Sequence, residues 1–207
     1  MSDSDLNKFP FASAAATAAT QKLAQEEKLA ANLSKQLKAS GQMAARLGDP
    51  VLHPLPPVLT VSPGSPNVLI GGQPAWRGLP QAQVANLEKA KKESAKAVAI
   101  AEAVEDMAAG TSYAGAAKVY AEKKKLDEAK AMAELISAAA AGGTDIHVCA
   151  TPLPPILPLH GPGVVTSGSS TVLINGLPAC RMGDTIQEAI GPKNIIMSGN
   201  PTVIIGG

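Results

Sequence analysis

One strand-and-turn phrase occurs three times in this chain of 207 residues and limits what the chain can fold into. It reads GSPNVLIGG at residues 64–72, GSSTVLING at residues 168–176 and GNPTVIIGG at residues 199–207. Each copy holds three consecutive β-formers between glycines, which predicts a short strand that ends in a tight turn. Asn175 and Gly176 suit a type I′ hairpin, whose two turn positions both take positive φ. Three copies predict an object with approximate threefold repetition.

The bulk composition argues against a thick aromatic core. Aromatic residues make up 2% of the chain, whereas a globular core of this size normally buries more aromatic area. The net charge of +1 gives no electrostatic reason to expect nucleic acid or an anionic membrane as a partner. The charge-free runs at residues 50–76 and 146–180 are rich in proline and glycine, which excludes a membrane helix there. We therefore expect thin, repetitive packing.

Three Ala-rich, charged segments predict amphipathic helices at residues 12–40, 81–109 and 112–141. Gly110 and Ser112 supply a stop and a cap between the last two segments. These two segments predict a helical hairpin, and with the first they predict a three-helix bundle. The apolar stripes expected to face the bundle are Leu29, Leu33 and Leu37 in the first segment, Val84, Leu87, Ala90, Ala97, Ala101 and Val104 in the second, and Val119, Leu126, Ala129, Ala133, Ile136 and Ala140 in the third.

The β-rich pieces flank the helical hairpin. AARLGD at residues 44–49 returns as ACRMGD at residues 179–184, so related units stand on both sides. An antiparallel hairpin brings the chain back close to where it left, which predicts a helical insertion within one β module. The predicted organisation is an N-terminal amphipathic helix at 1–43, a first β part at 44–78, the inserted hairpin at 79–143 and a second β part at 144–207. The predicted fold class is α+β.

All three histidines lie in the β-rich pieces, at His53, His147 and His160. Cys149 follows His147 by two residues, so both side chains point to the same face of an extended strand. Zinc takes four His and Cys ligands in a closed tetrahedral site when its role is structural. One hypothesis is therefore a Zn²⁺ ion held by all four residues, which would stabilise a tapering end with little interior. The alternative is a set of separate loop histidines and a buried cysteine.

Several of these motifs resemble the PAAR-repeat proteins. QPAWRG at residues 73–78 and LPACRMGD at residues 177–184 stand where the family has its proline-alanine-alanine-arginine signature, each with one substitution. AARLGDPVLH at residues 44–53 resembles the prePAAR pattern found ahead of such domains. The resemblance covers two blocks and leaves the helical segments unexplained, because a typical member has no long helical insertion.

The resemblance implies a small β cone at the tip of a type VI secretion system. Its partner would be the trimeric VgrG-type spike protein, with one cone per trimer, and the tip would touch the target membrane only in passing. The family binds one zinc through three histidines and one cysteine, which maps onto His53, His147, His160 and Cys149. The opening repeats fit this role, because one chain with three strand-turn phrases can present a pseudo-threefold base to a threefold spike.

Two roles remain open for the helices. They are either an adaptor for a separate effector or chaperone, or a toxic effector themselves. Catalysis needs a nucleophile, an acid–base pair or an open metal site, and the helices contain no histidine or cysteine. We therefore expect no enzymatic activity and no toxin domain after the last repeat. The polar N-terminus lacks the features of a signal peptide, so we expect a protein made in the cytoplasm and secreted by the type VI system.

Overall fold

The computed structural model describes residues 10–39, 42–53, 57–60, 62–152 and 159–206. Its helices are α2 (Pro10–Ala39), α3 (Gln81–Ala108) and α4 (Ala114–Ala140), and its strands are short and antiparallel. The predicted α+β class is confirmed. The strands are β1 (Met43–Ala44), β2 (Leu69–Ile70), β3 (Gln73–Pro74), β4 (Ile146–Pro152), β5 (Leu159–Val165), β6 (Leu173–Ile174), β7 (Leu177–Pro178), β8 (Thr185–Glu188), β9 (Asn194–Ile195) and β10 (Asn200–Ile204).

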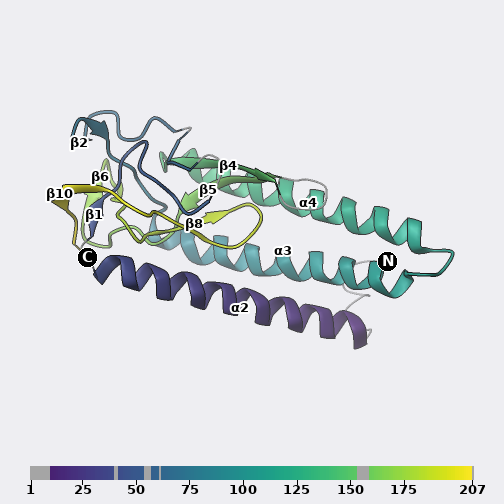
Figure 1. The fold of residues 1–207 in the computed structure, drawn as a ribbon. Coiled ribbons are helices and arrows are strands. Elements are labelled where there is room, and N and C mark those ends of the chain that lie inside the picture. The colour runs from purple at the N-terminus through teal and green to yellow at the C-terminus, as the bar shows by residue number, and fades with distance from the viewer. Residues whose placement is uncertain (1–9, 40–41, 54–56, 61, 153–158, 207) are drawn as a thin grey trace.

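The three helices lie side by side, with α3 between α2 and α4 (Figure 1). The strands gather along one end of this layer, and the turn between α3 and α4 extends well past them (Figure 1). Leu79 just before α3, Val84 in its first turn and Ile136 near the end of α4 pack together with Val164 of β5. This core fixes the near end of the hairpin on the β module. Among the described residues, no helix combines the length and hydropathy needed to span a bilayer.

The helix faces differ from the expected stripes. Leu29, Val119 and Leu126 are exposed, whereas Ala30 and Ser34 of α2 and Ala121 of α4 are buried. The prediction was wrong for these leucines and the valine because small alanine side chains let helices approach closely, and the closest approach decides the buried face. For α3 the predicted stripe is confirmed at Val84, Leu87 and Ala101, which are buried.

Three antiparallel strand pairs repeat around the base of the β module. β2 pairs with β3 and β6 pairs with β7, so two of the repeated phrases form tight hairpins. Asn175 has a φ of 54° and Gly176 a φ of 78°, which confirms the predicted turn. The third phrase lies in β10, which pairs with β1 near the other end of the sequence. The threefold set is thus closed by joining the first and last strands of the described chain.

Backbone hydrogen bonds at the centre repeat with the same threefold order. Ala45 N donates to Cys180 O, Cys180 N donates to Trp76 O, and Trp76 N donates to Ala45 O, at 2.9, 3.0 and 2.9 Å. This ring joins residues from all three repeats through the main chain. Trp76 is fully buried within it, so its role is packing rather than binding at a surface.

Each repeat also contains an arginine–aspartate pair next to this ring. Arg46 binds Asp49, and Arg181 binds Asp184, with the aspartate three residues after the arginine. In the remaining repeat, Arg77 binds Asp145 through two charge-assisted bonds of 2.9 Å, from Nε to Oδ2 and from Nη2 to Oδ1. In all three pairs the aspartate N–H donates to the arginine carbonyl oxygen, at 3.0 to 3.1 Å. The chain therefore leaves the β module into α3 and returns to it from α4 within one arginine–aspartate turn.

We expect Asp145→Asn to destabilise the protein by roughly 3–5 kcal/mol, because it leaves the charge of Arg77 buried without its counter-ion. The Asp145 side chain is 2% exposed and the Arg77 side chain is 11% exposed. Urea unfolding measures the loss, and Asp49→Asn is the matched control. The Arg46 side chain is 20% exposed, so the loss there should be smaller. Equal losses in the two variants would show that burial does not decide the strength of these pairs.

Candidate metal centre

The four-stranded sheet β4–β5–β8–β9 builds the end of the β module away from the base hairpins. His147 of β4 lies opposite Gly163 of β5, which in turn lies opposite Glu188 of β8. Gly163 offers no side chain between its two neighbours, and a Cβ added there would lie 2.9 Å from Glu188 Cγ. The register thus leaves room for His147 and Glu188 to share one face.

Four side chains from three parts of the chain converge at this sheet. Ligand atoms of His53, Cys149 and Glu188 all lie within 4.8 Å of one another. Nε2 of His53 lies 2.6 Å from Nε2 of His147, and the two ring centroids are 4.7 Å apart. We call His53, His147, Cys149 and Glu188 the vertex cluster.

His160, the remaining residue of the predicted zinc set, reaches the vertex cluster through Glu188. Its Nδ1 lies 2.8 Å from Glu188 Oε2. The structure therefore brings His53, His147 and Cys149 together and places His160 beside them on the carboxylate. Glu188 was missed by the sequence analysis, because an isolated glutamate in a short polar stretch gives no signal of burial. Only the strand register reveals it.

Burial keeps the two facing imidazoles neutral. Desolvation lowers the pKa of His53 and lowers that of His147 to about 4, where the neighbouring His53 adds to the shift. His53 Nε2 lies 3.4 Å from Glu188 Oε1, yet this contact is not an ion pair at neutral pH because the imidazole carries no charge. Neutral imidazole is the form that binds a metal ion.

The donor chemistry fits a zinc ion. Two imidazole nitrogens that face each other can share only one hydrogen, and Nδ1 of both His53 and His147 is buried with no hydrogen-bond partner in the described part of the chain. Buried polar atoms are normally satisfied, so such orphans need an explanation. Nitrogen, thiolate and carboxylate donors at one point are those that Zn²⁺ prefers.

Comparison with known families decides what kind of module this is. The PAAR motif family model matches residues 136–187 and residues 158–207. The chain therefore contains PAAR repeats. The PAAR family is a structural family of type VI secretion spike-tip proteins, and the match supports that role here. Searches among curated proteins and among solved structures gave no significant match.

The structural repeats extend the PAAR pattern beyond the matched residues. Leu47 N donates to Pro74 O, and Met182 N donates to Met43 O, each across a repeat boundary. Gly78 N donates to Pro178 O in the same way. Residues 43–46 and 74–77 therefore occupy the same place in the ring as the PAAR signature at residues 178–181.

The metal-free PAAR module is expected to lose stability as the pH falls from about 6.5 to about 4. Between these values the unfolded chain protonates His147 and the folded chain does not, since burial lowers its pKa to about 4. The shift of the His147 pKa corresponds to a loss of about 3 kcal/mol in the free energy of unfolding once the pH has reached about 4. Thermal unfolding between pH 7 and pH 4 measures it, with His147→Gln as a control that should flatten the slope. A melting temperature that rises on acidification would contradict the assignment.

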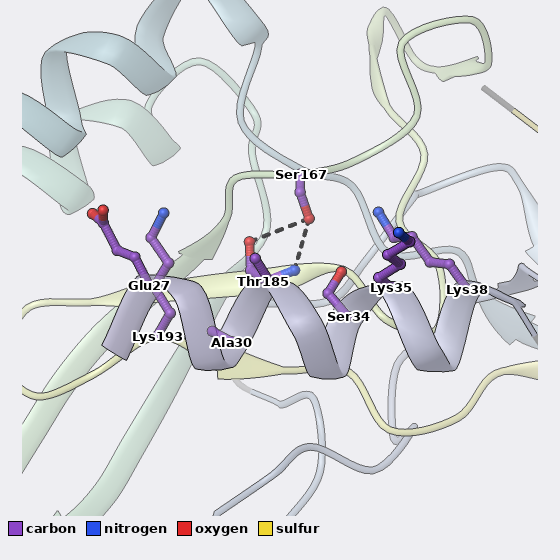
Figure 2. A pocket seen from close by; sticks show the side chains of 9 residues that line it. Glu27, Ala30, Ser34, Lys35, Lys38, Ser167, Thr185 and Lys193 are labelled. Carbon is purple, nitrogen blue, oxygen red and sulfur yellow. Dashed lines mark hydrogen bonds between the residues drawn. The ribbon is translucent and has the colours of Figure 1, made fainter. Parts of the chain in front are cut away.

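A cleft of about 390 Å³ lies between α2 and the β module, and no residue of the vertex cluster lines it (Figure 2). Two of its lysines are in ion pairs, Lys38 with Asp184 and Lys193 with Glu88, both at 2.7 Å. Ser34 Oγ donates to the main-chain oxygen of Gly183 at 2.5 Å. No histidine or cysteine is among the residues that line it. The Lys38–Asp184 ion pair and the Ser34–Gly183 hydrogen bond hold α2 on the PAAR module.

Proposed function

We propose that the protein caps the trimeric VgrG-type spike of a type VI secretion system, with one chain on each trimer. The observation that carries this proposal is the base of the PAAR module. Leu69, Leu173 and Ile204 hold equivalent positions in the three strand pairs and are 62, 59 and 62% exposed. Together they give a single chain a threefold apolar face.

The base is suited to docking because its exposed residues are apolar and rest on a packed apolar layer. Beneath the exposed residues lies a layer with threefold order, in which Ile70, Ile174 and Ile205 are buried. Valines and alanines of the three repeats complete the layer: Val68, Val172, Val203, Ala44, Ala75 and Ala179. A preformed apolar surface binds without a large ordering cost, and its threefold order matches that of a trimeric partner.

The second part of the proposal is a structural zinc ion in the vertex cluster. His53, His147 and Cys149 would hold it, and the fourth position falls to the His160–Glu188 pair. When bound, the ion supplies folding free energy at an end of the module with little apolar interior. A site closed by four protein ligands leaves no position for a reacting water, which supports a structural rather than an enzymatic role.

The third part concerns the helices. We assign residues 79–143 as an insertion in the second PAAR repeat, since Arg77 and Asp145 pair as one turn despite the helices between them. The distal halves of α3 and α4 and the turn between them extend past the strands and expose Met107, Tyr113 and Val119. This projecting end is where an effector or chaperone would attach, and the secretion machine would carry it out with the tip.

The capping role is tested by mixing the purified chain with the trimeric spike and separating the mixture by size exclusion. We expect the two proteins to elute together. A folded chain that elutes apart from the spike at micromolar concentration would refute the proposal. Chain with residues 81–141 replaced by a short linker should elute with the spike as well, because the exposed base residues all lie outside the helices.

A further inference from the structure

Glu188 is a fully buried carboxylate at the vertex, with no exposed surface. It ends β8 and lies across Gly163 from His147. A buried carboxylate is costly unless a cation or several hydrogen bonds compensate for the lost water. In the described part of the chain, ring nitrogens of His53 and His160 lie 3.4 and 2.8 Å from its two oxygens.

The two oxygens of Glu188 have different surroundings. Oε2 lies 2.8 Å from Nδ1 of His160. Oε1 accepts a hydrogen bond of 2.9 Å from Nδ2 of Asn194 and lies 3.4 Å from Nε2 of His53. Each carboxylate oxygen can accept about two bonds. Oε1 thus has acceptor capacity left on the side where His53 lies.

His160 contacts the vertex cluster through one edge of its ring. Its Nδ1 is occupied by Glu188, and the opposite edge of its ring lies over Gly191 in the turn between β8 and β9. A Cβ added to Gly191 would be 3.2 Å from His160 Nε2 and 3.3 Å from Cε1. Nε2, the other ring nitrogen of His160, therefore faces the main chain of this turn.

We propose that Glu188 is the fourth ligand of the vertex metal, beside His53, His147 and Cys149, and that His160 orients its carboxylate. The inference rests on the zinc binding proposed above. Zinc also binds carboxylate oxygen, at about 2.0–2.2 Å. Two neutral imidazoles, a thiolate and a carboxylate together balance the charge of one Zn²⁺ ion.

The role of His160 follows from the same contacts. A ligating carboxylate is normally held by a hydrogen bond from a residue just outside the metal shell, which fixes its orientation. His160 Nδ1 on one oxygen and Asn194 on the other hold the Glu188 carboxylate in this way. His160 is thus a positioning residue that acts on the metal through Glu188.

The first test needs no substitution. X-ray absorption of the zinc-loaded full chain counts imidazole ligands through their outer-shell scattering. We expect two imidazoles, one sulfur and one further oxygen. A spectrum with three imidazoles would place His160 in the metal shell and overturn the inference while leaving the proposed zinc site intact. A folded chain that takes up no zinc would overturn both.

The second test compares two variants by zinc competition with a chromophoric chelator. Glu188→Gln should lower zinc affinity by more than about 100-fold, because a ligand is lost, whereas His160→Gln should lower it by about 10–100-fold and keep one zinc per chain. Glutamine at position 160 retains an N–H that can donate to Glu188. Glu134→Gln on the exposed side of α4 is the control and should change nothing. The opposite ranking of the two variants would overturn the inference.

Discussion

A Leu173→Asp chain is expected to stay folded and to bind the trimeric spike at least about 100-fold more weakly, as central apolar anchors of interfaces contribute roughly 2–4 kcal/mol or more. Leu173 is 59% exposed in the free chain, so the new carboxylate is solvated there. In the complex it would be buried against an apolar surface without a partner, which is costly. Biolayer interferometry against immobilised spike trimer measures the loss.

Leu126→Asp is the matched control for this experiment. Leu126 is also a large exposed apolar residue, but it lies on α4 outside the base. It should leave spike affinity unchanged. An equal loss in both variants would point to a general surface effect, and unchanged affinity of Leu173→Asp would show that the spike binds elsewhere.

Replacing His147 by alanine should remove zinc and lower the melting temperature by more than about 10 °C, since roughly 1 kcal/mol corresponds to about 2–4 °C in a chain of this size. A structural zinc contributes its binding free energy directly to folding. His147 is 1% exposed and lies 2.6 Å from His53 in the vertex cluster, so the alanine variant loses a proposed ligand. Metal analysis and calorimetry on the same sample measure both effects.

Chelation is the internal control for that prediction. A strong chelator should lower the melting temperature of the unaltered chain to that of His147→Ala and should leave the variant where it is. A variant that retains one zinc per chain would remove His147 from the ligand set. A variant that loses zinc but melts with the unaltered chain would show that the ion contributes nothing to stability.

Much of the β architecture was predictable because repetition is a property of the sequence itself. The phrases at residues 64–72 and 168–176 form the predicted hairpins, with positive φ at Asn175. The pairing of β1 with β10 was not predictable, because neither strand has its partner nearby in the sequence. The structure shows this pairing as the third member of the set that the β2–β3 and β6–β7 hairpins begin.

The vertex was predictable in part, for a related reason. Histidine and cysteine are rare in this chain and stand out, so His53, His147 and Cys149 were natural candidates. Glutamate is common and usually solvated, so Glu188 gave no signal until the sheet placed it across Gly163. Asp145 was hidden in the same way, since the helices separate it from Arg77.

The measurement that tests the account most directly is the composition of the complex with the spike, by native mass spectrometry. Only a chain that presents all three base positions itself can cap a trimer alone. We predict one copy of this chain with three spike subunits. Three copies on each trimer would contradict the account, because each spike subunit would then bind its own chain and the threefold base would have no role.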